Sequence, residues 1–161
     1  PVLLSLAAVA LCHPVHAGDP TNDVWPKPQK VDLANPTVIS AEQLDPASVK
    51  NFLPLVEAFK SRKLRPSGKI AIQTTTGDAA KSALNTAQVP AVPGAYLLKV
   101  GADGIAITAA EEDGIFYASQ TLAQMIEADG KLTPCTVADW PAMPFRGSIE
   151  GFYGKPWEHA R

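Results

Sequence analysis

The sequence has few of the residues that build metal centres, disulfide frameworks and nucleophilic triads. Two cysteines and three histidines occur in 161 residues, and Cys12, His13 and His16 all lie among the first 17. From residue 18 onward Cys135 is the one remaining thiol in the sequence, which excludes an internal disulfide framework. A zinc site or a Ser-His-Asp triad would have to be built around His159, so we expect neither, and no metal. Cys135 is expected to be a small buried hydrophobic residue.

An excess of charge of either sign is also absent. Fourteen Lys and Arg residues are balanced by sixteen Asp and Glu residues, which gives a formal net charge of −2 without long runs of like charge. Without a basic surface that could neutralise phosphates, no nucleic-acid partner is expected. The 15 prolines and 11 glycines make the chain rich in turns, but its 46% of hydrophobic residues is too many for a disordered one. This composition predicts one folded domain of roughly 100–150 residues.

The sequence begins with an uncharged apolar run over residues 2–11 that is too short to span a bilayer. Val15 and Ala17 then occupy the two positions that signal peptidase reads, which predicts a signal peptide over residues 1–17. The protein is therefore expected to be secreted or periplasmic, without stable membrane insertion. A buried strand or helix is one alternative for this segment. A lipid anchor on Cys12 is another, and the bulky leucine before it is unfavourable for that modification.

Regular patterns follow an extended, proline-stiffened segment in which Trp25 is expected to pin the chain to the domain. Residues 37–40 predict a short strand, and Asp45 followed by proline predicts a helix with an aspartate cap. Pro54 interrupts that helix, so a kink or a restart capped by Asn51 is expected. One helical face would carry the apolar residues Val49, Phe52, Leu53, Val56 and Phe59.

A β-hairpin over residues 96–109 is the clearest local pattern. Apolar residues alternate on both sides of a Gly-Ala-Asp-Gly turn, in which Gly101 and Gly104 are expected to supply positive φ. Residues 69–74 alternate as another strand. The stretch 77–93 is rich in Ala, Asn, Gln and Pro and predicts a surface excursion.

A further helix is predicted from Asp113 to about Glu127, with Gly130 placed to end it. The acidic cluster at residues 111–113 is expected to complement the positive end of this helix rather than to transfer protons. The helical spacing is carried by Ile115, Ala118, Leu122, Met125 and Ile126. Two helices and at least four short strands predict an α+β fold, with both helices on one face of a small sheet.

Two prolines in residues 139–144 predict a domain junction, after which residues 145–150 predict a new strand. This strand leads into Gly-Phe-Tyr-Gly at residues 151–154 and then into Lys-Pro-Trp. Glycines allow a ligand to touch the backbone, and aromatic rings offer flat faces to the C–H groups of a sugar. A tight corner packed by core rings is the alternative, and Trp157 is expected to pack the first loop or helix after the strand.

Residues 145–161 resemble the opening of the catalytic (β/α)8 barrel of glycoside hydrolase family 84, the β-N-acetylglucosaminidases that include bacterial homologues of O-GlcNAcase. The shared pattern, Arg-Gly-x-x-Glu-Gly-Phe-Tyr-Gly-x-Pro-Trp, is long and specific. Family 20 enzymes, the β-hexosaminidases, continue after Arg-Gly into a Leu-Asp-x-x-Arg pattern that this sequence lacks, so family 84 is favoured. Other segments resemble the small α/β domain that precedes the barrel in families 84 and 20: residues 25–29, 95–100, 104–107, 113–122 and 139–141.

The resemblance implies retaining hydrolysis of terminal β-linked N-acetylglucosamine (GlcNAc) by substrate assistance. In that reaction the acetamido oxygen attacks the anomeric carbon, while two neighbouring aspartates orient the acetamido group and move the proton. In the family this pair follows a later barrel strand, so we expect no catalytic residue in residues 1–161 and no activity from this chain alone. The implied chemistry uses no metal or organic cofactor, and the implied partner is a β-linked GlcNAc glycan or glycoprotein.

The resemblance carries substrate-binding roles onto three residues. Gly151 matches a residue that meets the sugar through its main chain at the end of the first barrel strand, and Phe152 and Tyr153 would form the pocket wall or pack the core. Glu150 and Arg146 are expected to support the barrel structurally; direct sugar contact by Arg146, as in family 20, is the alternative.

These inferences divide the sequence into a signal remnant (1–17), an accessory α/β domain (18–140) and the start of a truncated barrel (141–161). The favoured function is the N-terminal part of an exo-β-N-acetylglucosaminidase. A fragment of a family 20 β-hexosaminidase and a non-catalytic, sugar-binding or docking module are the alternatives.

Overall fold

The computed structural model describes residues 20–33 and 37–143. Their strands are β1 Lys30–Leu33, β2 Ile39–Ser40, β3 Ile72–Thr75, β4 Tyr96–Val100, β5 Ile105–Ala109, β6 Lys131–Leu132 and β7 Cys135–Asp139. Their helices are α1 Pro46–Val49, α2 Leu53–Arg62, α3 Gly77–Thr86 and α4 Glu112–Met125, with a 3-10 turn at Ala41–Gln43. None of the helices in these two ranges is long and apolar enough to cross a membrane.

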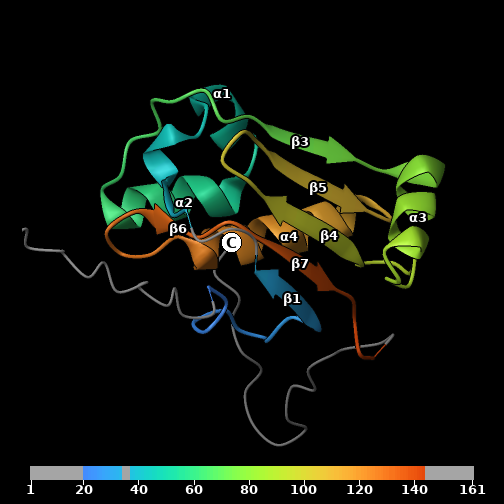
Figure 1. The fold of residues 1–161 in the computed structure, drawn as a ribbon. Helices are drawn as coiled ribbons and strands as arrows, with labels where there is room; N and C mark the ends of the chain where they lie inside the picture. Colours follow the sequence, from blue (N-terminus) through green and yellow to red (C-terminus); the bar gives the residue numbers. More distant parts are fainter. Residues whose placement is uncertain (1–19, 34–36, 144–161) are drawn as a thin grey trace, which may run out of the picture.

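Five of the strands form one mixed sheet in the order β1-β7-β4-β5-β3 (Figure 1). The predicted hairpin is its centre: β4 pairs with β5 antiparallel, from Tyr96 opposite Ala109 to Val100 opposite Ile105. On the other side β4 pairs antiparallel with β7, and β1 pairs antiparallel with β7 at one edge. The strand β3 closes the opposite edge in parallel with β5, while β2 and β6 form a separate two-stranded sheet.

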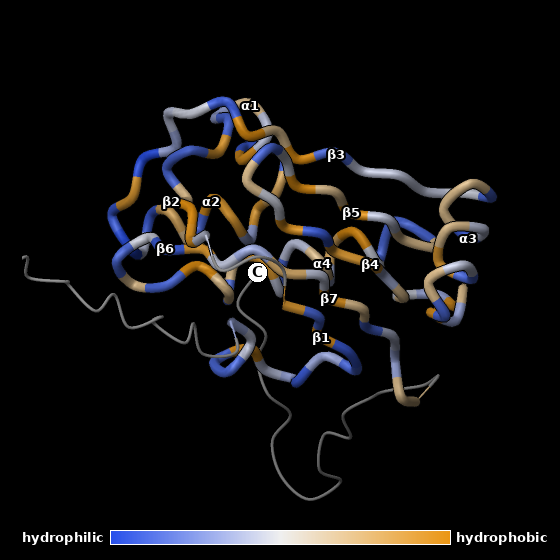
Figure 2. The backbone as a smooth tube through the Cα atoms, viewed as in Figure 1, coloured by the Kyte–Doolittle hydropathy of each residue, from blue (hydrophilic) through white to orange (hydrophobic). Residues whose placement is uncertain are grey.

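The main core lies between this sheet and the helices α2 and α4. Alternate residues of β4, Tyr96, Leu98 and Val100, are buried on the face that α4 covers, and α2 packs against α4 in the same core. Figure 1 shows α4 running behind the sheet, and Figure 2 shows hydrophobic segments concentrated where α4, β4 and β5 meet. The predicted α+β fold is therefore confirmed for the described residues.

The first turn of α4 lies unusually close to the sheet at Gly114. A Cβ at this position would lie 2.5 Å from the carbonyl oxygen of Ala95 and 2.9 Å from the Cβ of Ala109. Two turns later the Thr121 hydroxyl lies 2.6 Å from the phenolic oxygen of Tyr96, within hydrogen-bond distance inside the core. Burial raises the pKa of Tyr96 above its usual range, so the phenol stays neutral. A small residue and a buried hydrogen bond thus fix α4 on the sheet.

The first predicted helix is instead two helices, and this changes which residues face the core. Asp45 caps α1 as predicted, because its carboxylate accepts hydrogen bonds from the backbone N–H and the hydroxyl of Ser48. The chain then restarts at α2 with Phe52, not Asn51, in the cap position. The restart resets the helical phase, so Leu53 is 69% exposed while Leu55 is fully buried.

The prediction of a surface excursion is wrong for Gly77–Thr86, which form α3. This helix buries only Ala80 and Leu84, too few apolar positions for a strong periodic pattern. Leu84 joins a second, smaller core cluster with Leu97 of β4 and Ala138 of β7. These strand residues alternate with those that face α4, so a third helix contributes to the opposite face of the sheet.

The hairpin turn and the end of α4 differ from prediction in detail. Gly101 donates its N–H to the carbonyl of Gly104 at 3.0 Å, but neither glycine has a left-handed φ. Positive φ occurs instead at Gly130, at 84°, within the turn that joins α4 to β6. The helix itself ends earlier, at Met125, because Ile126 adopts an extended conformation. Cys135 is buried in β7, as predicted.

Candidate functional site

The residues predicted to bind substrate, Gly151, Phe152 and Tyr153, lie outside the described residues, as do Arg146 and Glu150. Their roles stay predictions. So do the signal segment 1–17 and the first barrel strand. Within residues 20–33 and 37–143, the candidate site is a hollow that residues 139–143 help to line.

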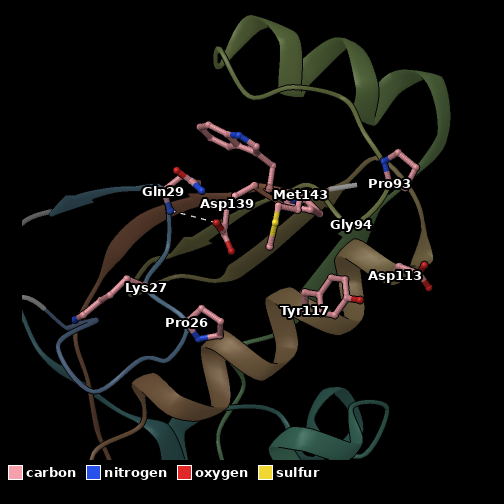
Figure 3. A pocket seen from close by; sticks show the side chains of 12 residues that line it. Pro26, Lys27, Gln29, Pro93, Gly94, Asp113, Tyr117, Asp139 and Met143 are labelled. Atoms are coloured by element: carbon pink, nitrogen blue, oxygen red, sulfur yellow. Dashed lines mark hydrogen bonds between the residues drawn. The ribbon is translucent and has the colours of Figure 1, made fainter. Parts of the chain in front are cut away.

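The hollow has a volume of about 520 Å³ and lies beside the first half of α4 (Figure 3). Four parts of the chain line it: the segment before β1, the loop before β4, the start of α4, and the residues at and after the end of β7. Its lining residues are Pro26, Lys27, Gln29, Pro93, Gly94, Asp113, Tyr117, Asp139, Trp140, Pro141, Ala142 and Met143.

Gly94 sets how closely the loop before β4 approaches α4. Its φ of 80° lies in the left-handed region, and an added Cβ would lie 3.1 Å from both Tyr117 Cε2 and Pro141 Cγ. The Tyr117 ring, the Gly94 backbone and the Pro141 ring therefore pack together. This contact joins α4 to the chain that leaves β7.

The segment before β1 is held beside the hollow by hydrogen bonds. Lys27 donates from Nζ to the carbonyl oxygens of Thr21 and Asn22, at 2.6 and 2.9 Å. The Gln29 N–H donates to Asp139 Oδ1 at 3.2 Å. The Lys27 hydrogen bonds join its ammonium group to two carbonyls of the same segment. The hydrogen bond from Gln29 to Asp139 holds that segment against the end of β7.

Trp25 does not pin this segment as predicted, because its indole is 78% exposed. Val24, the residue before it, is buried in the main core instead. The backbone N–H of Trp25 donates to Gln124 Oε1 on α4 at 2.9 Å. The anchor is thus a buried valine and a backbone hydrogen bond.

Two carboxylates reach the hollow, and their surroundings indicate structural roles. The predicted role of residues 111–113 is confirmed, since Glu111 is the N-cap of α4 and Glu112 and Asp113 lie in its first turn. There they complement the positive end of the helix dipole. Asp139 already accepts the Gln29 N–H. Across the described ranges, no group of three or more His, Cys, Asp or Glu residues could hold a metal ion.

An aromatic pair on α4 adjoins the hollow. The side chains of Phe116 and Tyr117 are 49% and 46% exposed, and their rings meet edge to face with centroids 5.8 Å apart. Sequence reasoning missed them. The signal was available, because the helical phase set by Ala118 and Leu122 places both aromatics on the outward face, where polar residues are usual.

The family model for domain 2 of glycosyl hydrolase family 20 matches residues 21–140. The chain belongs to this family of domains. The predicted resemblance to the accessory domain of families 84 and 20 is confirmed. The described hollow therefore belongs to a glycoside hydrolase accessory domain.

Solved structures from both enzyme families share the fold of this domain. "Structure of CpGH84B" and "Structure of CpGH84D" align with TM-scores of 0.56 and 0.57, each at 20% identity and over 84% of this chain. A family 20 exo-β-N-acetylglucosaminidase from Vibrio harveyi, solved in complex with N-acetylglucosamine, aligns at 0.50 with 21% identity over 80% of this chain. The chain spans 25%, 26% and 20% of these three proteins.

Proposed function

We propose that this chain is the N-terminal part of an exported, retaining exo-β-N-acetylglucosaminidase of family 84. The observation that carries the proposal is the order of two features. A family 20 domain 2 match over residues 21–140 is followed at once by the Arg-Gly-x-x-Glu-Gly-Phe-Tyr-Gly-x-Pro-Trp pattern of residues 146–157. In enzymes that carry the accessory domain, this is the place of the first barrel strand.

The described residues support a division of labour in which the accessory domain does no chemistry. Asp113 and Asp139 line the same hollow, but one complements a helix N-terminus and the other accepts a backbone N–H. Proton transfer to a leaving oxygen needs a carboxyl group held within hydrogen-bond reach of the substrate. We therefore assign the acid–base aspartates to the polypeptide after residue 161, and main-chain contact with the sugar to Gly151. Phe152 and Tyr153 would form the wall of the sugar site.

The proposed reaction is tested on the polypeptide extended to the natural end of its gene. We expect it to release 4-methylumbelliferone from the β-GlcNAc glycoside with retention at the anomeric carbon, without added metal or cofactor. Fluorination of the acetamido methyl group weakens the attacking oxygen, so kcat should fall stepwise through the mono-, di- and trifluoro substrates. The 161-residue chain is the matched control and should show no turnover.

Two other outcomes would change the assignment. Rates that do not depend on acetamido fluorination would contradict substrate assistance. An inactive extended polypeptide, together with chitooligosaccharide binding by the 161-residue chain, would instead support a non-catalytic sugar-binding module. Export is tested separately: mature protein from the native host should begin at Gly18, as read by N-terminal sequencing.

A further inference from the structure

We infer that residues 77–94 form a flap that opens as one unit while the rest of the domain stays folded. The flap consists of α3 and the loop that joins it to β4. In the closed state it packs on the face of the five-stranded sheet opposite α4, against Leu97 and Ala138. Opening of the flap is independent of the proposed function.

The flap is attached to the domain through few buried side chains. In α3 only Ala80 and Leu84 are buried, whereas α4 buries seven residues. Leu84 and Val89 belong to the second core cluster, and no described residue of this cluster is also part of the main core. Figure 1 shows α3 at one end of the sheet, away from α1 and α2. Undocking of the flap therefore leaves the main core packed.

The hydrogen bonds of the flap are mostly internal. The N–H groups of Ala87, Gln88 and Val89 donate to carbonyl oxygens of α3. Away from the turns at its two ends, the described residues provide one hydrogen bond between the flap and the rest of the domain. In this bond Lys30 Nζ donates to the carbonyl oxygen of Gln88 at 3.3 Å, at an exposed position. Opening thus breaks one hydrogen bond at the surface and no strand pairing.

Glycines in the left-handed region lie at both ends of the flap. The φ angle is 78° at Gly77 and 80° at Gly94. A Cβ added to Gly77 would have no atom within 4 Å, so the space around this residue is open. Gly94 packs against Tyr117 and Pro141, which holds that end of the flap in place. Element-terminal residues that tolerate large changes of φ and ψ are the usual hinges of a moving segment.

Opening exposes apolar surface on the side of the sheet away from α4. Leu84 and Val89 of the flap, and Leu97 and Ala138 of the sheet, cover one another only in the closed state. A weakly attached unit opens at a lower free energy than the whole domain unfolds. The open form is therefore a minor state of the folded protein.

Hydrogen–deuterium exchange of the 161-residue chain, followed by mass spectrometry, measures this opening. An isolated helix of ten residues is marginal in water, so α3 loses its hydrogen bonds once the flap undocks. The amides of residues 81–89 report on the flap, and those of residues 116–125 report on α4. In the wild type we expect the flap amides to be protected, but to exchange roughly a hundredfold faster than the α4 amides.

Two substitutions separate local opening from global unfolding. Ile107→Val weakens the main core, which stays packed when the flap opens, so the α4 amides should exchange roughly fivefold faster and the flap amides within about twofold of the wild type. Leu84→Ala removes packing that exists only in the closed state, so the flap amides should exchange at least roughly tenfold faster. Leu53→Ala removes the same atoms from an exposed site and is the matched control, with unchanged rates.

Equal wild-type rates for the flap and α4 would overturn the inference, because residues 77–94 would then open only when the domain unfolds. Equal acceleration of both sets of amides by Ile107→Val would overturn it for the same reason. Flap amides without any protection would also overturn it, because the closed state would not be populated. If Leu84→Ala does not fold, the wild type and Ile107→Val still decide the result. GlcNAc hydrolysis enters none of these measurements, so failure of the proposed function is seen separately.

Discussion

Replacing Gly114 with alanine changes the stability of the domain through two effects of opposite sign. Alanine has a higher helix propensity than glycine by up to about 1 kcal/mol, so propensity alone predicts that the substitution stabilises α4. The added Cβ, however, would lie 2.5 Å from the Ala95 carbonyl oxygen, about 0.9 Å short of the 3.4 Å at which ordinary contact begins. A second contact, at 2.9 Å from Ala109 Cβ, blocks movement toward β5.

The size of the stability loss depends on whether the atoms next to the added Cβ can move away. Ala109 belongs to β5 and Ala95 directly precedes β4, and the Ala95 carbonyl also accepts the N–H of Ala110 at 3.2 Å, so it is not free to turn away. The first turn of α4 must therefore lift from the sheet, at a cost typical of overpacking in a core, about 1–3 kcal/mol. The lift would also weaken the packing of Ala118 and Leu122 in the core. We therefore expect the total cost to exceed the gain in helix propensity. The net loss should be about 1–2 kcal/mol, or roughly 4–8 °C in Tm for a domain of this size.

The assay is thermal and urea unfolding of the 161-residue chain, with Gln120→Ala as the control. Gln120 is exposed on the same helix, so its replacement should change the free energy of unfolding by less than about 0.5 kcal/mol. A Gly114→Ala variant that is as stable as the wild type, or more stable, would refute the reasoning. It would mean that α4 is not seated on β4 and β5 at the distance described.

Two further predictions concern hydrogen bonds in the same domain. Tyr96→Phe leaves the buried Thr121 hydroxyl without its 2.6 Å partner and should cost about 1–2 kcal/mol in urea unfolding, whereas Tyr117→Phe, at an exposed ring, should cost nothing measurable. The Ser48 hydroxyl that bonds Asp45 lowers the pKa of that carboxyl in the folded chain, so its stabilising contribution is present above the unfolded pKa, about 4, and is lost as pH falls through the folded value. The Tm difference between wild type and Asp45→Ala should therefore be constant from pH 7 to pH 5 and shrink below pH 4; a difference that grows on acidification would contradict this assignment.

The elements that sequence patterns predicted best are those in which local and tertiary preferences agree. In the hairpin, alternation places Leu98 and Ile107 opposite each other on the buried face, and the structure pairs them in that register. In α4 the apolar spacing matches the buried side from Ala118 to Ile126. Both elements pack against the same core, so burial reinforces the pattern that the residues already carry.

The elements that were missed depend on distant parts of the chain. Lys30–Leu33 alternate weakly and leave Leu33 exposed, yet they form β1 because β7 offers an antiparallel partner more than 100 residues later. The helix α3 forms with only two buried side chains, of which Leu84 reaches the second cluster through contacts with β4 and β7 residues. A local window contains neither partner, so a periodic pattern could not have located these elements.

The candidate site shows the same division between local and non-local information. The outward position of Phe116 and Tyr117 follows from the phase of α4 and could have been inferred from helical spacing alone. The hollow beside them could not, because it depends on the positive φ of Gly94 and on a hydrogen bond between Gln29 and Asp139, 110 residues apart. Helical spacing identifies side chains that stay partly exposed, whereas only the fold brings Tyr117 of α4 next to Gly94 and Pro141 from distant parts of the chain.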